Sequence, residues 1–515
     1  MFKSAIRYLL LALLFVTAPV FAQFQRVIDD FRVNDPVGWD DSWYPDIACD
    51  RNGNFVVVWT CRVYEGSPTP DTCNLYYQRY DSVGNRIGGN VLLSYNIPFH
   101  GSSVAMNPNG RFVIGWAERT SSINQMRCQI FDSTGTMAGD DFLVNDTTIL
   151  AYYSGPKAAM DSAGNFVVCW CDNRVGNNDV YFKRYDDNGN PISGDVKVSD
   201  DTANASQSAL EISMNRDGRF VMVWEDPREG GVNPDIYTQR YDAAGIAQGN
   251  NFKVNDDAGD SNQGGPDVSL DNQGNFVVAW GDGRLSQYGY VYAQRYDSLG
   301  NTLGANFKVS VKDTSGSPSI AHDIVGNFLI CWQQGGLGVT SSKIIAQRYD
   351  INGTVIGSNF YVNNLSYPGD RMFPQVNGYG DNNYLLVWQD SRLVKDGTWH
   401  VYANKWGTYT GVNDEVDENG KLPGLVMVYQ NNPNPFNNRT RIHYKINKEY
   451  NVSLRVYNLN GELVKTLVDR KQSPGFYGIA WDGTNREGKR SSAGCYFYIL
   501  ATGSERLIRK CLLIK

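Results

Sequence analysis

The chain has 515 residues, of which 42% are hydrophobic and 20% charged, so it is long enough for several packed cores and too apolar to be disordered. Its net charge of −7 and isoelectric point near 5.3 indicate an acidic surface that repels phosphate backbones, which argues against nucleic acid as a natural partner. The length fits about three ordinary domains, or an array of small repeated units.

Residues 1–22 have the pattern of a Sec signal peptide. Lys3 and Arg7 precede an apolar run over residues 8–16, and small residues at Val20 and Ala22 mark a cleavage site before Gln23. The run is too short to span about 30 Å of hydrocarbon, so it is not a membrane anchor. Cleavage leaves 45 basic and 54 acidic residues, a net charge of −9. No later segment resembles a transmembrane helix.

An apolar stretch that ends in Trp recurs seven times along residues 23–408. The seven tryptophans are Trp59, Trp116, Trp170, Trp224, Trp280, Trp332 and Trp388, separated by 57, 54, 54, 56, 52 and 56 residues. Each unit holds four short runs rich in β-branched and aromatic residues, without helical periodicity. Four antiparallel strands in about 50 residues, repeated seven times, are typical of a seven-bladed β-propeller.

Two turns in most units share the form Asp-x-x-Gly. The first separates strands one and two, at residues 50–53, 161–164, 271–274 and 323–326. The second follows strand three, at residues 81–84, 132–135, 186–189, 242–245, 297–300 and 350–353. The Asp side chain can cap such a turn while Gly takes a positive φ, so both are predicted to be antiparallel hairpins.

The two ends of the repeat region complement each other. The seventh unit stops after its third strand, near residues 402–406, whereas residues 31–34 match residues 252–255 and precede the first complete unit. We therefore expect the N-terminal segment to supply the outer strand of the seventh blade, which closes the ring and leaves no open sheet edge.

Nine cysteines are scattered without the spacing of a disulfide framework or a zinc site, and most are expected to be core residues. Cys61 and Cys73 flank a Pro-rich loop and could close a hairpin. The four histidines show no metal-binding spacing, and neither a serine-hydrolase elbow nor a phosphate-binding loop occurs. No metal and no cofactor is therefore predicted.

A charged pair, Asp-x-Arg, follows the repeated Trp in four units. The pairs are Asp172 and Arg174, Asp226 and Arg228, Asp282 and Arg284, and Asp390 and Arg392, with a variant at Glu118 and Arg119. They fall in loops between the second and third strands, which open on one mouth of a propeller channel. They are candidate ligand-binding residues, or each Asp accepts its own Arg and fastens the hairpin.

Two further features lie on the same predicted face. One is the set of equivalent positions at the start of each first strand, which vary in charge: Asp46, Ser103, Lys157, Glu211, Asp267, Ser319 and Gln375. Because loops and rims carry function on rigid scaffolds, this variation is informative. The other is Trp39 and Trp43, which could stack on a sugar or pack beneath a loop.

A polar stretch at residues 409–424 is predicted to be a linker. Residues 425–515 after it do not continue the repeat pattern of residues 23–408. Alternating strands such as residues 452–457 and 494–500 predict a small Ig-like β-sandwich. Its motifs are Asn-Pro-Asn-Pro-Phe-Asn at 432–437, Val-Tyr-Asn-Leu-Asn-Gly at 456–461, Trp-Asp-Gly-x-Asn-x-x-Gly at 481–488 and the ending at 512–515.

With these motifs the segment resembles the type A C-terminal sorting domain of type IX secretion substrates, itself similar to the Ig-like domain of flagellar hook-capping proteins. The resemblance implies Sec export to the periplasm, recognition by the type IX secretion machinery, and delivery to the outer-membrane surface or medium. The repeats also resemble secreted repeats with a Gln-Arg-Tyr-Asp motif, which begins here at Gln78, Gln239, Gln294 and Gln347. That resemblance implies an extracellular propeller and no particular activity.

Two classes of function remain open. One is a non-enzymatic surface or secreted module that binds a protein or a glycan, favoured by near-uniform repeats without catalytic motifs. The other is a glycan-acting enzyme, since sialidases and polysaccharide lyases also use propellers. The Ser-x-Asp-x-Gly-x-x-Trp boxes characteristic of sialidases are absent from the sequence.

Overall fold

The structure is a computed structural model that describes residues 23–35, 41–62, 73–97, 101–120, 123–146, 155–201, 205–229, 233–257, 259, 261–312, 315–335, 341–392, 398–409, 426–428, 431, 434–446, 449–473, 475–503 and 505–514. The predicted signal peptide at 1–22 and nearly all of the predicted linker lie outside the described residues. The chain divides into two compact units, one of residues Phe24–Thr408 and one that contains Tyr409–Lys515.

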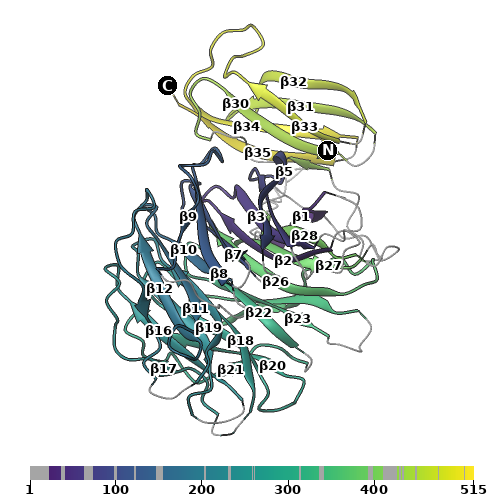
Figure 1. Cartoon of the computed structure of the whole chain (residues 1–515). Helices are drawn as coiled ribbons and strands as arrows, with labels where there is room; N and C mark the ends of the chain where they lie inside the picture. The colour runs from purple at the N-terminus through teal and green to yellow at the C-terminus, as the bar shows by residue number, and fades with distance from the viewer. Residues whose placement is uncertain are drawn as a thin grey trace, which may run out of the picture. The chain divides into compact units, whose positions relative to one another are not determined.

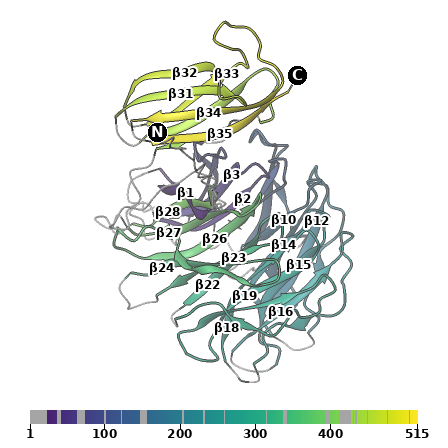
Figure 2. The ribbon, with the colours of Figure 1, turned by 180° about the vertical axis from the view of Figure 1, so that it is seen from behind.

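The first unit consists of seven four-stranded antiparallel sheets arranged in a ring (Figures 1 and 2). Consecutive innermost strands contact one another around the ring, and the last contacts the first. The innermost strands are β2 (Asp41–Cys49), β6 (Ser102–Met106), β10 (Lys157–Met160), β14 (Ser208–Met214), β18 (Gln263–Leu270), β22 (Ser315–His322) and β26 (Arg371–Tyr379).

Each sheet continues outward through three more strands. The second strands are β3 (Phe55–Arg62), β7 (Phe112–Thr120), β11 (Phe166–Asp172), β15 (Phe220–Asp226), β19 (Phe276–Asp282), β23 (Phe328–Gln334) and β27 (Asn383–Asp390). The third strands are β4 (Cys73–Tyr80), β8 (Ile123–Phe131), β12 (Asp179–Tyr185), β16 (Asp235–Tyr241), β20 (Tyr290–Tyr296), β24 (Lys343–Tyr349) and β28 (His400–Tyr409). The outer strands are β5 (Arg86–Ile97), β9 (Phe142–Leu143), β13 (Val196–Lys197), β17 (Phe252–Lys253), β21 (Phe307–Lys308), β25 (Val355–Tyr361) and, in the seventh blade, β1 (Gln23–Arg32).

The position of β1 confirms the predicted ring closure. The seventh sheet has the order β1-β28-β27-β26, so its outer strand comes from the N-terminus. Just beyond β1, the Val33 amide donates to the Val401 carbonyl at 2.8 Å, which continues the pairing. The predicted seven-bladed β-propeller is therefore confirmed.

The second strands are buried on both faces because each blade packs between two others. Trp280 is fully buried in a cluster with Val221, Ile236 and Val254 of the preceding blade. Trp224 is likewise buried against Val167 of the blade before it. Both tryptophans thus pack between adjacent blades. Each of the seven propeller clusters contains one repeat Trp together with residues of two adjacent blades.

The Asp-x-x-Gly turns form as predicted. In the turn after β20, Asp297 Oδ1 accepts hydrogen bonds from the amides of Leu299 (2.9 Å) and Asn301 (2.8 Å). Gly300 has a φ of +86°, which a side chain would strain. Asp50 caps the turn after β2 in the same way, with amide contacts of 2.8 and 2.9 Å.

The Gln-Arg-Tyr-Asp segments have structural contacts. Gln294 donates to the carbonyls of Arg295 (2.8 Å) and Gly304 (3.0 Å), which fixes the outer hairpin of its blade. Arg295 reaches the Ile351 carbonyl of the next blade at 3.0 Å. The motif therefore ties the outer part of one blade to the next.

A disulfide between Cys61 and Cys73, which the sequence left open, is opposed by the strand register. In the β3–β4 ladder Cys61 lies opposite Asn74, and Cys73 lies opposite Arg62. Side chains alternate between faces along a strand, so the two sulfurs point to opposite faces. Consistent with this, Cys61 and Cys73 belong to different core clusters.

The second unit is the predicted small β-sandwich. One sheet has the order β29 (Met427–Val428), β30 (Thr440–Ile446), β33 (Gly475–Trp481), and the other β32 (Leu463–Gln472), β31 (Tyr450–Asn458), β34 (Gly494–Thr502), β35 (Glu505–Leu513). Both sheets contribute to one core, which contains Tyr444, Trp481 and Tyr498.

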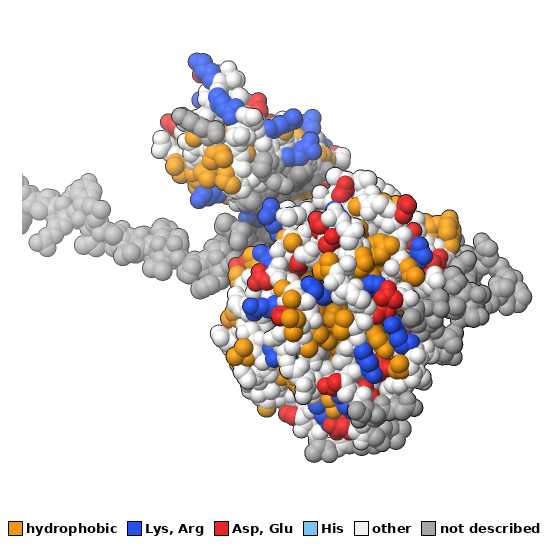
Figure 3. All heavy atoms as spheres, turned by 60° about the vertical axis from the view of Figure 1, so that its left-hand side comes forward, with side chains coloured by type: hydrophobic (Ala, Val, Ile, Leu, Met, Phe, Trp, Pro, Cys, Tyr) orange, Lys and Arg blue, Asp and Glu red, His pale blue; other side chains and the backbone are white. Residues whose placement is uncertain are grey.

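The second unit is also basic. Residues 425–515 contain 15 Lys and Arg and six Asp and Glu, a net charge of +9. Its Lys and Arg side chains gather on the smaller body in Figure 3. The rest of the mature chain is correspondingly more acidic than the chain as a whole.

Candidate functional site

In each of the four Asp-x-Arg pairs, the Asp and the Arg bind each other. Each Asp is buried and accepts a hydrogen bond from the indole of the Trp two residues before it, at 2.8 to 3.1 Å. Each Asp also accepts from the backbone amide and the guanidinium of its own Arg. These pairs are Asp172 and Arg174, Asp226 and Arg228, Asp282 and Arg284, and Asp390 and Arg392.

The guanidinium of each pair makes further contacts within the scaffold. It stacks on a third-strand tyrosine at 4.0 to 4.5 Å from the ring centroid, as Arg284 does on Tyr292. Arg284 also bonds Asp256, which follows the outer strand of the preceding blade, at 2.6 Å. This geometry favours the hairpin-fastening role, and ligand binding by the four pairs stays a prediction.

The fifth, variant pair differs. Glu118 contacts Arg127 of the third strand in its own blade at 3.5 Å. The side chain of Arg119 lies outside the part of the chain that the structure describes.

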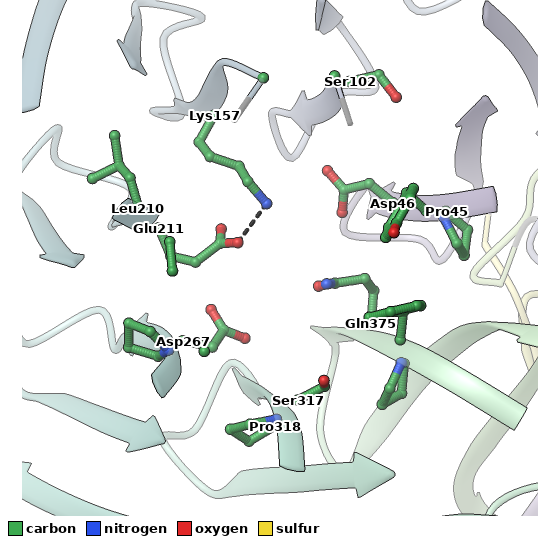
Figure 4. Close-up of a pocket in the computed structure, with 18 of the residues that line it drawn as sticks. Pro45, Asp46, Ser102, Lys157, Leu210, Glu211, Asp267, Ser317, Pro318 and Gln375 are labelled. Carbon is green, nitrogen blue, oxygen red and sulfur yellow. Dashed lines mark hydrogen bonds and ion pairs between the residues drawn. The ribbon is translucent and has the colours of Figure 1, made fainter. Parts of the chain in front are cut away.

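The seven unequal first-strand positions converge on the propeller axis, where they form what we call the waist of the channel: Asp46, Ser103, Lys157, Glu211, Asp267, Ser319 and Gln375. Two cavities of about 320 Å³ and 250 Å³ share as lining Asp46, Lys157, Glu211, Asp267 and Gln375. In Figure 4 the side chains of Lys157 and Glu211 point toward each other, and Asp46, Asp267 and Gln375 point into the same space. The ring thus brings together residues that lie more than 50 positions apart in the sequence.

The larger cavity is the mouth of the channel. Its wall is formed by the N-terminal parts of the innermost strands and their approaches, including Pro45, Pro156, Pro266, Pro318 and Pro374. Fixed φ angles at proline make this wall rigid.

Two aromatic rings also line the mouth. Tyr44 and Phe373 pack with their centroids 4.9 Å apart. Both residues have a positive φ, of 48° and 51°, at a register shift of the innermost strand. A bulge at this point redirects the next side chains, which here are Asp46 and Gln375 at the waist.

The ionisable groups of the waist perturb one another. Lys157 forms an ion pair with Glu211, and their side chains are 29% and 25% exposed to the hollow channel. Burial disfavours the charged form of Lys157, but the negative charges of Glu211 and Asp46 outweigh this effect, so the pKa of Lys157 is raised. Burial raises the pKa of Glu211 to about 7, against the lowering effect of Lys157.

The two aspartates of the waist are held by backbone amides. Asp267 accepts from Val268 (2.7 Å) and Ile320 (2.8 Å), and burial nevertheless raises its pKa to about 6. Asp46 spans two blades in the same manner, accepting from the amides of Ile47 (2.8 Å) and Val104 (2.9 Å). Burial raises its pKa as well.

The smaller cavity continues the channel away from the mouth. His322 lines it, bonded through Nδ1 to Ser269 Oγ at 2.9 Å. Burial lowers the pKa of His322 to about 3, so this imidazole is neutral at physiological pH. Among the described residues, no group of three His, Cys, Asp or Glu is arranged to hold a metal ion.

Sequence reasoning identified the seven waist positions but missed the aromatic wall. The available signal was an x-Pro-polar tripeptide in or directly beside five of the innermost strands, as in residues 44–46 and 373–375. Of the two tryptophans singled out, Trp43 packs against Trp399 at 5.5 Å. Trp39 lies outside the described residues.

One family matches part of the chain. Residues 440–504 match the FlgD Ig-like domain family, which confirms the similarity of the tail to the Ig-like domain of hook-capping proteins. No curated protein sequence matches the chain.

Several solved structures are similar. A Dyadobacter fermentans protein of unknown function covers 75% of this chain and 99% of its own, at 12% identity and a TM-score of 0.47. A Penicillium chrysogenum α-L-arabinanase covers 75% and 99%, at 10% identity and a TM-score of 0.42. PorZ of Porphyromonas gingivalis, a surface component of the type IX secretion system, covers 91% and 59%, at 14% identity and a TM-score of 0.38. Identities this low transfer none of these proteins' activities to this chain.

The described residues form no helix that is long and apolar enough to cross a membrane.

Proposed function

We propose that the propeller is a non-enzymatic binding module that takes a glycan at the mouth of its central channel. The observation that carries this proposal is the meeting of unlike side chains at the waist. Three carboxyl groups, one ammonium and the Gln375 amide surround one cavity, beside the Tyr44 and Phe373 rings. The side chains that recur in every blade hold the ring together, whereas the waist side chains differ from blade to blade and form a specific ligand surface.

The chemistry of the mouth suits a sugar. Aromatic faces stack on the apolar face of a sugar ring, while fixed carboxylates and amides accept from and donate to hydroxyl groups. A cavity of about 320 Å³ lies at the small end of ligand pockets, so it fits one terminal unit of a chain. The rigid, proline-lined wall limits the conformational cost of binding.

Binding of a glycan library to the chain without its signal peptide tests this proposal. We expect Phe373→Ala and Gln375→Ala to weaken binding of any hit by at least about tenfold, the effect of losing one anchoring contact. Asp217→Asn is the matched control, because Asp217 is exposed in the turn between β14 and β15. Unchanged binding in both mouth variants would contradict a mouth site.

A glycan-acting enzyme is the second candidate, and one observation favours it. Glu211 and Asp267 lie in one cavity with pKa values raised to about 7 and about 6, the setting in which one carboxyl group donates a proton. Under this alternative Glu211→Gln abolishes hydrolysis or elimination of a bound glycan while binding remains. Release of no product from any bound glycan supports the binding module.

For the whole chain we propose export by Sec and then type IX secretion, to the outer-membrane surface or the medium. Under this proposal residues 1–22 are the signal peptide, 23–408 the propeller, 409–424 a linker and 425–515 the sorting domain. The Ig-like tail is a compact unit with its own core, as a signal read in folded form requires.

Truncation and fusion test the export route. A chain that ends at Gly424 should stay in the periplasm, and residues 425–515 fused to an unrelated exported protein should carry it to the surface. Cell fractionation distinguishes these outcomes. Normal surface delivery of the truncated chain would contradict the sorting assignment and favour an accessory role for the tail.

A further inference from the structure

The waist of the channel carries an excess of negative charge. Asp46, Glu211 and Asp267 line both cavities, and Lys157 is the one Lys or Arg among the described residues of the two linings. His322, farther along the channel, does not correct the balance because burial keeps its imidazole neutral. When all three carboxyl groups are ionised, two negative charges have no counterion within the cavity walls.

The carboxyl groups retain capacity to accept hydrogen bonds. Each oxygen of Asp46 and of Asp267 receives one backbone amide, and a carboxylate oxygen can accept a second donor. The amides fix both groups in place, so no side-chain rearrangement is needed to meet a ligand. In Glu211 the ion pair with Lys157 engages Oε1.

A buried hydroxyl lies at the same level, in the lining of the smaller cavity. Ser103, at the waist position of the second blade, is 2% exposed and lines the channel. Its Oγ has no hydrogen-bond partner among the described residues. A buried polar atom without a partner is costly unless a ligand or water satisfies it.

From this arrangement we infer that the glycan bound at the mouth carries a protonated amine, as in an amino sugar whose nitrogen is not acetylated. This inference rests on the proposed glycan-binding function and specifies its ligand class. An ammonium group has three donors and no acceptor, so it matches carboxylates better than a hydroxyl group does. Within a poorly solvated cavity such charge-assisted hydrogen bonds are stronger than neutral ones.

The perturbed pKa values agree with this assignment. Burial raises the pKa of each of the three carboxyl groups, and the positive charge of Lys157 offsets this only in part. A bound ammonium supplies further positive charge and stabilises the ionised forms.

The test compares two probes that differ only at nitrogen: a fully deacetylated glucosamine oligomer and an N-acetylglucosamine oligomer of equal length. Isothermal titration at pH 7 and low salt should show the amine oligomer binding at least about tenfold more tightly, the gain from one charge-assisted hydrogen bond. Glu211→Gln and Asp267→Asn should each reduce this preference. Lys157→Met should increase it, because it removes the competing internal cation.

Asp217→Asn removes one exposed negative charge away from the waist and is the control for non-specific attraction. It should leave the preference unchanged. Intrinsic tryptophan fluorescence of each variant confirms folding, and the opposite sign expected for Lys157→Met keeps the test valid if one carboxyl variant fails to fold.

Three outcomes would overturn the inference. Equal or tighter binding of the acetylated oligomer, lost in Phe373→Ala, would refute the amine while the proposed glycan site stands. Binding of neither oligomer and of no other glycan would refute both proposals. Tighter binding of a lysine-containing peptide than of either oligomer would show that the cation comes from a protein partner.

Discussion

Replacing Asp282 with alanine decides whether the Asp-x-Arg pairs hold the scaffold or bind a ligand. Asp282 is 1% exposed and accepts from the Trp280 indole at 2.8 Å, and from the Arg284 amide at 2.9 Å and guanidinium at 2.8 to 3.0 Å. Its removal leaves a buried indole N–H without a partner and takes from Arg284 its buried counterion. Removal of one partner of a buried ion pair lowers the free energy of unfolding by about 3–5 kcal/mol.

The remaining contacts of Arg284 place the expected cost at the low end of that range. Arg284 is 18% exposed and keeps Asp256 at 2.6 Å, so its charge is not left wholly uncompensated. We expect Asp282→Ala to lower the free energy of unfolding by about 3 kcal/mol. Asp256→Ala removes the other partner of the same guanidinium, but Asp256 is 49% exposed, so its loss should cost about 1 kcal/mol or less.

Urea unfolding of both variants, followed by tryptophan fluorescence, measures this difference, and titration with a glycan hit measures binding. The fastening role predicts a large stability loss in Asp282→Ala with affinity unchanged in the fraction that stays folded. A stability loss below about 1 kcal/mol together with lost binding would refute the reasoning and make the pair a ligand site.

Three further predictions concern the ring and the channel. Trp280→Ala should lower the free energy of unfolding by about 3–5 kcal/mol. Trp280→Phe should lower it clearly less, since the phenyl ring refills part of the cavity between blades. A small loss in both variants would mean that the indole is not buried. Deletion of residues 23–34 should lower the urea midpoint and broaden the transition, because β28 becomes an open sheet edge; an unchanged transition would contradict closure by β1. The free energy of unfolding should fall as the pH drops from about 6.5 toward 3, because the folded state holds the pKa of His322 down at about 3 while the unfolded chain takes up the proton. The variant His322→Gln should make this fall shallower. An unchanged pH profile in the variant would mean that His322 titrates normally.

The scaffold could be predicted well from the sequence because each blade repeats the same local sequence motifs. The seven Trp, 52 to 57 residues apart, indicated the number of blades, and the Asp-x-x-Gly turns indicated the hairpins. The match of residues 31–34 to 252–255 indicated the closing strand. Each of these signals is local or periodic, so it can be read without coordinates.

The site was less accessible from sequence because it depends on ring closure. Variation at Asp46, Lys157 and Glu211 was visible, but periodicity does not show that their side chains share one cavity. The aromatic pair of Tyr44 and Phe373 was missed because the two residues belong to the first and seventh blades and meet through closure. The internal pairing of Asp282 with Arg284 also needed the structure, since a repeated charge pair suits either role.

Repetition itself separates scaffold from site in this molecule. A side chain that recurs in equivalent turns, such as the Asp of the Asp-x-Arg pairs, has the same neighbours each time and finds its partners inside its own blade or the next. The axis differs, because there one residue from each blade meets the other six, and nothing in the packing of a blade requires those seven to be alike. Charge and shape on the axis can therefore vary without cost to the ring. Lys157, facing Glu211 between Asp46 and Asp267, has a set of neighbours that no other blade position reproduces. Selectivity for a ligand can thus arise at the waist while every blade keeps the contacts that hold it to the next.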